Sequence, residues 1–394
     1  MIKCFKYSAI IIFTLILFGC KQTKSLKVQS LNKNELEALI IQEKKALEAS
    51  SRNDYLHYAN LALLHHKDSN STEAAKYYEK AWKWFDEHLT QNIVNLGVSK
   101  LYNDTVKTYR PHYLVRYQFR FMAILNYLTL NDSEKALIET RRLSRLIRMD
   151  KDYFSEKRSV KARQYFLIIT SILFSHNNEI NLGWADMLYA YRLNKETFPE
   201  KFLPLINLKN EGDNSKFISY VEKNKAIKIT CKGLFLGLKS VSTSVNVNDY
   251  WSHINVIQGD SEDELLKDAL TSLLARKVVK ITYAVPHFYA NDNENFLYSF
   301  NELFSESWEL QKTRLVTSAL FRIVYKSILA YGVSNKLSKG EEDVFGVLLG
   351  NIGSYVIWAT EKADTRTISY LPNFVKIDLF SINKNENQIS TSWE

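Results

Sequence analysis

The sequence is short of the residues that interrupt helices. Its 394 positions include only 12 glycines and 5 prolines, which argues against a turn-rich β architecture and favours helices. Three cysteines are too few for a disulfide-stabilised scaffold. No HExxH, GxSxG, P-loop or Cys/His motif occurs along the chain, so no catalytic or metal-binding signature is evident. Because 46% of the residues are hydrophobic and 13% aromatic, the composition excludes a disordered stalk.

The first twenty residues have the layout of a secretory signal. Lys3 and Lys6 precede an apolar run from Tyr7 to Phe18, which ends at Gly19 and Cys20. A run of about twelve residues is shorter than the roughly twenty that span a bilayer. The segment resembles a bacterial lipoprotein signal, which implies cleavage between Gly19 and Cys20 and lipidation of the cysteine. The alternatives are an ordinary signal peptide with a chance cysteine and a true N-terminal helix.

The residues beside the predicted cleavage site bear on where the anchor lies. Phe18 stands where lipoprotein signals usually have a small residue. Lys21 follows the cysteine, and no acidic pair comes after it. By resemblance to known sorting rules, nothing here retains the protein at an inner membrane or exports it to the cell surface. We therefore expect a lipid anchor in the cell membrane, at the outer membrane and facing the periplasm where two membranes exist.

Cleavage of this signal would change the number of free cysteines and the net charge of the chain. Cys4 would leave with the signal and Cys20 would carry lipid, so Cys231 would remain alone, without an internal disulfide. No histidine partner is evident near Cys231, and we expect it to be a small buried side chain. Loss of Lys3 and Lys6 lowers the net charge from +9 to +7. That surplus reflects either a generally Lys-rich composition or affinity for anionic lipid or wall polymer, and no nucleic-acid module is evident.

The pattern of apolar residues changes along the chain and predicts five parts: a signal at 1–19, a polar tether at 20–33, a helical domain at 34–220, a mixed α/β domain at 225–382 and a polar tail at 383–394. The predicted fold class is mostly α (α+β), an array of α-hairpins followed by a small sheet with packed helices. Strands are expected at 225–231, 242–247 and 278–285, paired in one small sheet.

The helical part resembles degenerate tetratricopeptide repeats. One hairpin is expected at 55–88, with Ser71 or Thr72 capping its second helix. Small residues that suit close helix crossings recur at Ala74, Ala136 and Gly183. Their spacings of 62 and 47 residues differ from the usual 34, so a generic antiparallel bundle is the alternative. Either arrangement leaves grooves, which bind peptides more often than they catalyse reactions.

An arginine cluster is the main candidate binding site. Arg141, Arg142, Arg145 and Arg148 follow Glu139 on one predicted helix. Spacings of three and four residues place Arg141, Arg145 and Arg148 on one side, where they can hold a phosphate or carboxylate bidentately. A solvated face with local ion pairs is the alternative. The adjacent pair His65–His66 does not suggest a metal, because neighbouring helical residues point about 100° apart.

Four segments of the chain resemble a family of uncharacterised bacterial lipoproteins with a repeat-like helical half and a mixed second half. They are 124–128 with 139–142, 232–239, 281–289 and 361–372. The last segment contains Asp364, Arg366 and Pro372, which we interpret as structural. The chain departs from the family at Ile368, where a tryptophan is usual, and at 113–115, where a Tyr-Glu-Arg run is usual. The resemblance implies an architecture and a location, but no catalytic residues and no cofactor.

The leading hypothesis is a non-enzymatic, lipid-anchored scaffold of the cell envelope that holds a protein partner on its repeat-like groove. One alternative is an envelope hydrolase acting on wall material, for which the candidate residues are His253, Asp260, Glu262 and His287. The other is a binder of anionic lipid or wall polymer, which the net charge and the arginine cluster suggest.

Overall fold

In the computed structural model, residues Asn32–Glu394 form one compact unit. The residues described within it are 32–50, 54–89, 111–148, 159–235, 237–246, 249, 278–286, 297–310, 312–313, 316–317, 320, 366–380 and 388–393. The predicted mostly-α (α+β) class is confirmed, because an array of helices packs with a four-stranded mixed sheet.

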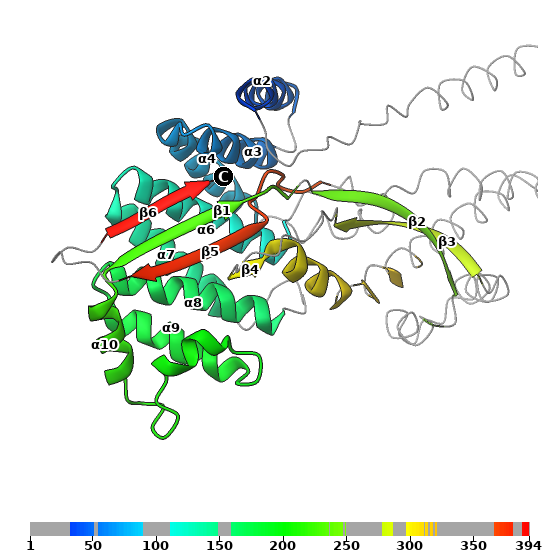
Figure 1. Cartoon of the computed structure of the whole chain (residues 1–394). Coiled ribbons are helices and arrows are strands. Elements are labelled where there is room, and N and C mark those ends of the chain that lie inside the picture. The colour runs from blue at the N-terminus through cyan, green and yellow to red at the C-terminus, as the bar shows by residue number, and fades with distance from the viewer. Residues whose placement is uncertain are drawn as a thin grey trace, which may run out of the picture. The chain divides into compact units, whose positions relative to one another are not determined.

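Three antiparallel α-hairpins form the body of the helical array (Figure 1). Helix α2 (Lys33–Ala49) precedes them, and Asn32 and Glu35 form a capping box at its start. The hairpins are α3 (Asp54–Lys67) with α4 (Ser71–Leu89), α6 (Tyr113–Thr129) with α7 (Ser133–Arg148), and α8 (Val160–His176) with α9 (Ile180–Leu193). The 3₁₀ helix η2 (Glu200–Leu205) and helix α10 (Ser215–Lys223) follow.

The three hairpin turns share one backbone geometry. Ser69, Asn131 and Asn178 have φ of 59°, 58° and 61°, the left-handed conformation that ends helices. In each turn the next residue donates its backbone N–H to the carbonyl five positions back, at 2.9 Å in all three. These are Schellman motifs, which end the first helix of each hairpin.

The cap of α4 differs from the prediction. Asn70, rather than Ser71 or Thr72, accepts the N–H of Glu73 on its side chain, at 3.3 Å. Asp132 accepts the N–H of Lys135 in the same way at the start of α7. In these two hairpins, the Asx residue that follows the left-handed position thus begins the second helix.

Small residues stand where the two helices of a hairpin cross. Ala74 and Ala136 are fully buried. A Cβ added at Gly183 would lie 2.3 Å from Ser175 Oγ and 2.8 Å from the carbonyl oxygen of Ser171. Helix α9 therefore approaches α8 more closely than any side chain at position 183 allows.

The main sheet has the strand order β4-β5-β1-β6. Strand β1 (Ala226–Lys232) pairs antiparallel with β5 (Phe374–Phe380) and parallel with β6 (Gln388–Trp393), and β4 (Tyr298–Ser299) pairs with β5. Strands β2 (Leu238–Asn246) and β3 (Val278–Pro286) form a separate two-stranded sheet. Two expectations are corrected: β1 does not join the other two predicted strands, and residues 388–393 of the predicted polar tail form a strand beside β1.

The sheet packs on the first helix of each hairpin. Trp393 of β6 meets His66 of α3 edge-on, with ring centroids 5.4 Å apart. Thr391 and Thr129 of α6 share a hydroxyl hydrogen bond of 2.9 Å, and Tyr298 of β4 packs against the first helix α8 through Phe166, at 5.4 Å between ring centroids. The core is therefore continuous across residues 220–225, where the sequence suggests a domain boundary.

Candidate functional site

An open groove lies on the second helices of the last two hairpins, α7 and α9. It has a volume of about 500 Å³ and is lined by Arg141, Ser144, Arg145, Arg148, Phe174, Leu182, Ala185 and Asp186. We call it the arginine groove. Three of the four arginines in the sequence cluster line it, whereas Arg142 lies outside the lining and pairs with Glu139, at 2.6 Å. The helical pitch explains this division, because at about 100° per residue Arg141, Arg145 and Arg148 fall within about 60° of one another around α7, whereas Arg142 lies about 100° from Arg141.

A buried carboxylate organises the floor of the groove. Asp186 of α9 is 1% exposed. It accepts hydrogen bonds from Arg148 Nε at 2.8 Å, Ser144 Oγ at 2.9 Å and Thr170 Oγ1 at 2.6 Å. These donors come from α7 and α8, so Asp186 joins three helices. Arg148 also lies over the Tyr189 ring, 5.1 Å from its centroid, and is held in place from two directions.

The other two arginines of the groove differ in their partners. Arg141 pairs with Glu179, the residue that precedes α9, at 2.5 Å. Arg145 is exposed, and within the described part of the chain no carboxylate pairs with it. The four-arginine cluster thus contains three ion pairs and, within the described residues, one guanidinium without a carboxylate partner.

Of the remaining residues singled out from the sequence, the structure describes Arg366, Ile368 and Pro372. Pro372 is buried, in a segment where Ser369 N–H donates to Asn60 Oδ1 of α3 at 2.9 Å. Arg366 is half-buried. Ile368 is fully buried. The hydrogen bond from Ser369 to Asn60 ties segment 366–372 to α3, which favours a structural role for this segment. Gly19, Cys20, Asp364, His253, Asp260, Glu262 and His287 lie outside the described residues.

A Ser–His contact that the sequence did not suggest lies at the start of α6. Ser307 Oγ is 3.1 Å from His112 Nε2 and donates to Tyr113 Oη at 2.7 Å. However, His112 Nδ1 accepts the N–H of Leu114 at 3.3 Å as the cap of α6, which places the imidazole proton on Nε2. A general base for Ser307 would need Nε2 unprotonated. Burial also lowers the pKa of His112 to about 3. We therefore interpret His112 as the cap of α6 and not as a catalytic base.

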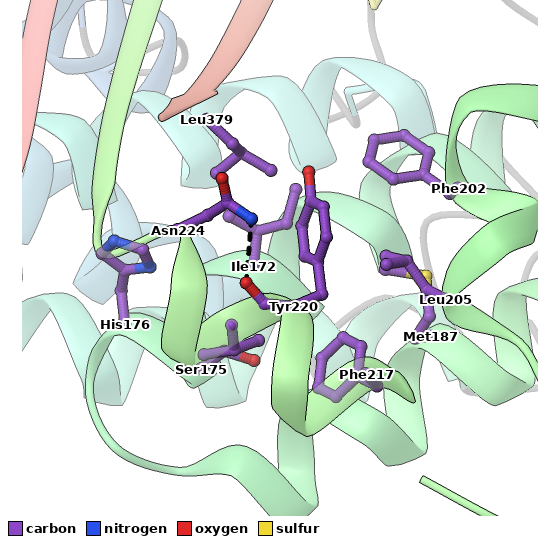
Figure 2. Close-up of a pocket in the computed structure, with 11 residues that line it drawn as sticks. Ile172, Ser175, His176, Met187, Phe202, Leu205, Phe217, Tyr220, Asn224 and Leu379 are labelled. Atoms are coloured by element: carbon purple, nitrogen blue, oxygen red, sulfur yellow. Dashed lines mark hydrogen bonds between the residues drawn. The ribbon is translucent and has the colours of Figure 1, made fainter. Parts of the chain in front are cut away.

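A second, smaller cavity lies where α8, α9, η2, α10 and β5 meet. Figure 2 shows the Tyr220 ring among apolar side chains that include Met187, Phe202 and Phe217, with the Asn224 amide bonded to the Tyr220 carbonyl. Its volume is about 20 Å³, which is room for one or two water molecules. It is therefore a packing defect and not a ligand site.

The buried histidines and the cysteine belong to the core. His66 bonds Tyr78 Oη at 3.2 Å, and burial lowers the pKa of His66 to about 3. Cys231 is a buried free thiol, as expected, whose pKa burial raises to about 12, so it is a poor nucleophile. In the described ranges, no group of three His, Cys, Asp or Glu residues is placed to hold a metal ion.

Among the helices within the described residues, none combines the length and hydropathy needed to cross a membrane. No protein-family model matches the chain, and no curated protein or solved structure matches it significantly.

Proposed function

We propose that the protein is a lipid-anchored, non-enzymatic interaction protein of the cell envelope, which holds a protein partner in the arginine groove. The lipoprotein-like signal ending at Cys20 supports the location. The hairpin array supports an interaction role, since stacked α-hairpins present extended binding surfaces. The family resemblance is in keeping with both parts of this proposal.

The observation that carries the proposal is which face of the helical array the described strands leave uncovered. The first helices α3, α6 and α8 are contacted by the protein's own strands through His66, Thr129 and Phe166. The second helices α7 and α9 instead frame a groove of about 500 Å³. We therefore place the partner on the second helices, and not on the first helices.

The anionic-polymer alternative has less support from the groove. Glu179 and Asp186 already pair with Arg141 and Arg148, so little free positive charge remains for a polyanion. The hydrolase alternative has no supporting constellation among the described residues, and its four candidate residues are outside the part of the chain that the structure describes.

Chemical cross-linking in intact cells, followed by mass spectrometry, tests the proposal. We expect one reproducible envelope protein to be cross-linked to the wild type and lost in a Cys20→Ala variant. Recovery of abundant bystanders alone, with the wild type still bound to membranes, would contradict it.

A further inference from the structure

The arginine groove has two kinds of wall. The three arginines line it along α7, whereas Phe174, Leu182 and Ala185 form an apolar patch from α8 and α9. Leu182 is 39% exposed, and covering it with another apolar side chain would be favourable. A ligand that complements the groove therefore combines an apolar group with an anionic one.

The ion pairs within the groove set the charge of that ligand. Glu179 compensates Arg141, and Asp186 compensates Arg148, which leaves the guanidinium of Arg145. One carboxylate matches this surplus and fits the bidentate geometry of an arginine. A phosphate-rich polymer would bring repeated negative charges and no apolar group, so it fits the two walls less well.

The length of the arginine wall sets the size of the contact. Arg141 and Arg148 are seven residues apart on α7, which corresponds to about 10 Å along the helix axis. An extended peptide covers that distance with about three residues. The groove is thus matched to a short linear segment.

We infer that the arginine groove binds a short acidic segment of the partner protein, in which an Asp or Glu carboxylate meets Arg145 and a neighbouring large apolar side chain covers Leu182. This inference rests on the proposed function and names the chemistry of the partner. Arg141 and Arg148, held by their own carboxylates, shape the groove on either side of Arg145.

The test is a selection from random peptides displayed on phage, against the full-length protein in phosphatidylcholine vesicles, which have no net charge. We expect enriched sequences with an Asp or Glu within about three residues of a large apolar residue. An enriched peptide should bind the Arg145→Gln variant about tenfold more weakly or worse. Its affinity for Arg192→Gln should be unchanged, because Arg192 pairs with Glu211 outside the groove.

Three results would overturn the inference: no enrichment, enrichment of sequences without acidic residues, or equal binding to the two variants. Binding of phosphatidylglycerol vesicles that depends on Arg145, without peptide enrichment, would overturn it in favour of a lipid headgroup. If cross-linking in cells recovers a partner while the selection fails, the proposed function stands and the inference alone is wrong. If the selection succeeds but no partner is found in cells, the proposed function is the part that fails.

Discussion

Arg148 donates from Nε to the buried Asp186 carboxylate at 2.8 Å and thereby ties α7 to α9. Ser144 and Thr170 donate to the same carboxylate, so its charge is satisfied without water. The pair explains why an arginine-rich helix face does not repel itself: its cations are matched by acids from the following hairpin. Among the described residues no carboxylate pairs with Arg145, and we propose that it meets the ligand.

Replacing Asp186 should destabilise the protein. Asp186→Asn leaves Arg148 without its counter-charge and disrupts the hydrogen bonds that the carboxylate accepts from Ser144 and Thr170. We therefore expect a loss of about 2–3 kcal/mol in the free energy of unfolding. Urea denaturation followed by circular dichroism measures it. Glu211→Gln is the control, because Glu211 pairs with Arg192 and Lys195 at the surface and should have little effect. Equal losses in the two variants would show that Asp186 does not organise the groove.

The close crossing of α8 and α9 predicts a second effect on stability. In Gly183→Ala, the new Cβ meets the backbone carbonyl of Ser171 at 2.8 Å, and we expect a loss of about 1–3 kcal/mol from overpacking. Gly212→Ala is the matched control, since its Cβ would lie 3.5 Å from Asn210 Oδ1, an ordinary contact. An unchanged unfolding midpoint for Gly183→Ala would mean that the helices are further apart than described.

Stability should fall in mild acid. Burial lowers the pKa of His66 and of His112 to about 3. In the unfolded chain, the same two imidazoles have a pKa of about 6.5. The unfolded state therefore binds more protons between pH 6.5 and 3, and stability present above pH 6.5 is lost as the pH falls. At pH 5 the loss is about 2 kcal/mol for each histidine. Urea denaturation at pH 7 and pH 5 measures it.

The double variant His66→Gln, His112→Asn provides the control for this pH dependence. The amide side chain introduced by His112→Asn retains an acceptor for capping α6, and neither new side chain titrates. The variant should lose less stability between pH 7 and pH 5 than the wild type. A loss of equal size would assign the acid sensitivity to other groups.

Lipidation makes its own prediction. If Cys20 is lipidated as we propose, its acyl chains would bury many methylenes at about 0.8 kcal/mol each, so the wild type should sediment with membranes and incorporate an alkyne-labelled fatty acid. Cys20→Ala should do neither. Label that persists in Cys20→Ala would show that the lipid is attached to another residue. A wild type free of membranes and label would favour an ordinary signal peptide.

The hairpins could be predicted because their signals are local. Apolar spacing of three to four residues and polar turns at 67–70 define α3 and α4 within a few residues. The cap of α4 was predicted wrongly, because Asn70 in the turn, and not Ser71 or Thr72, accepts the N–H of Glu73. The strand order of the sheet could not be predicted, because β1 pairs with strands about 150 residues away along the chain. No local sequence pattern specifies which distant strands pair.

The candidate site was predictable only in part. The spacing of Arg141, Arg145 and Arg148 placed them on one helix face, and they line one groove. Their partners Glu179 and Asp186 lie 38 residues from Arg141 and Arg148, so no local pattern indicates that two of the three charges are compensated. Asp186 itself looks like an ordinary helix residue until the hairpins pack.

The most direct test of the account is site-specific photo-cross-linking in intact cells, with benzoylphenylalanine at Leu182 inside the arginine groove. Leu208, which is 64% exposed and outside the groove lining, is the control position. We expect a specific cross-linked protein from position 182, weakened by Arg145→Gln and absent from position 208. Equal cross-linking from both positions, or none from 182, would contradict the claim that the arginine groove holds the partner.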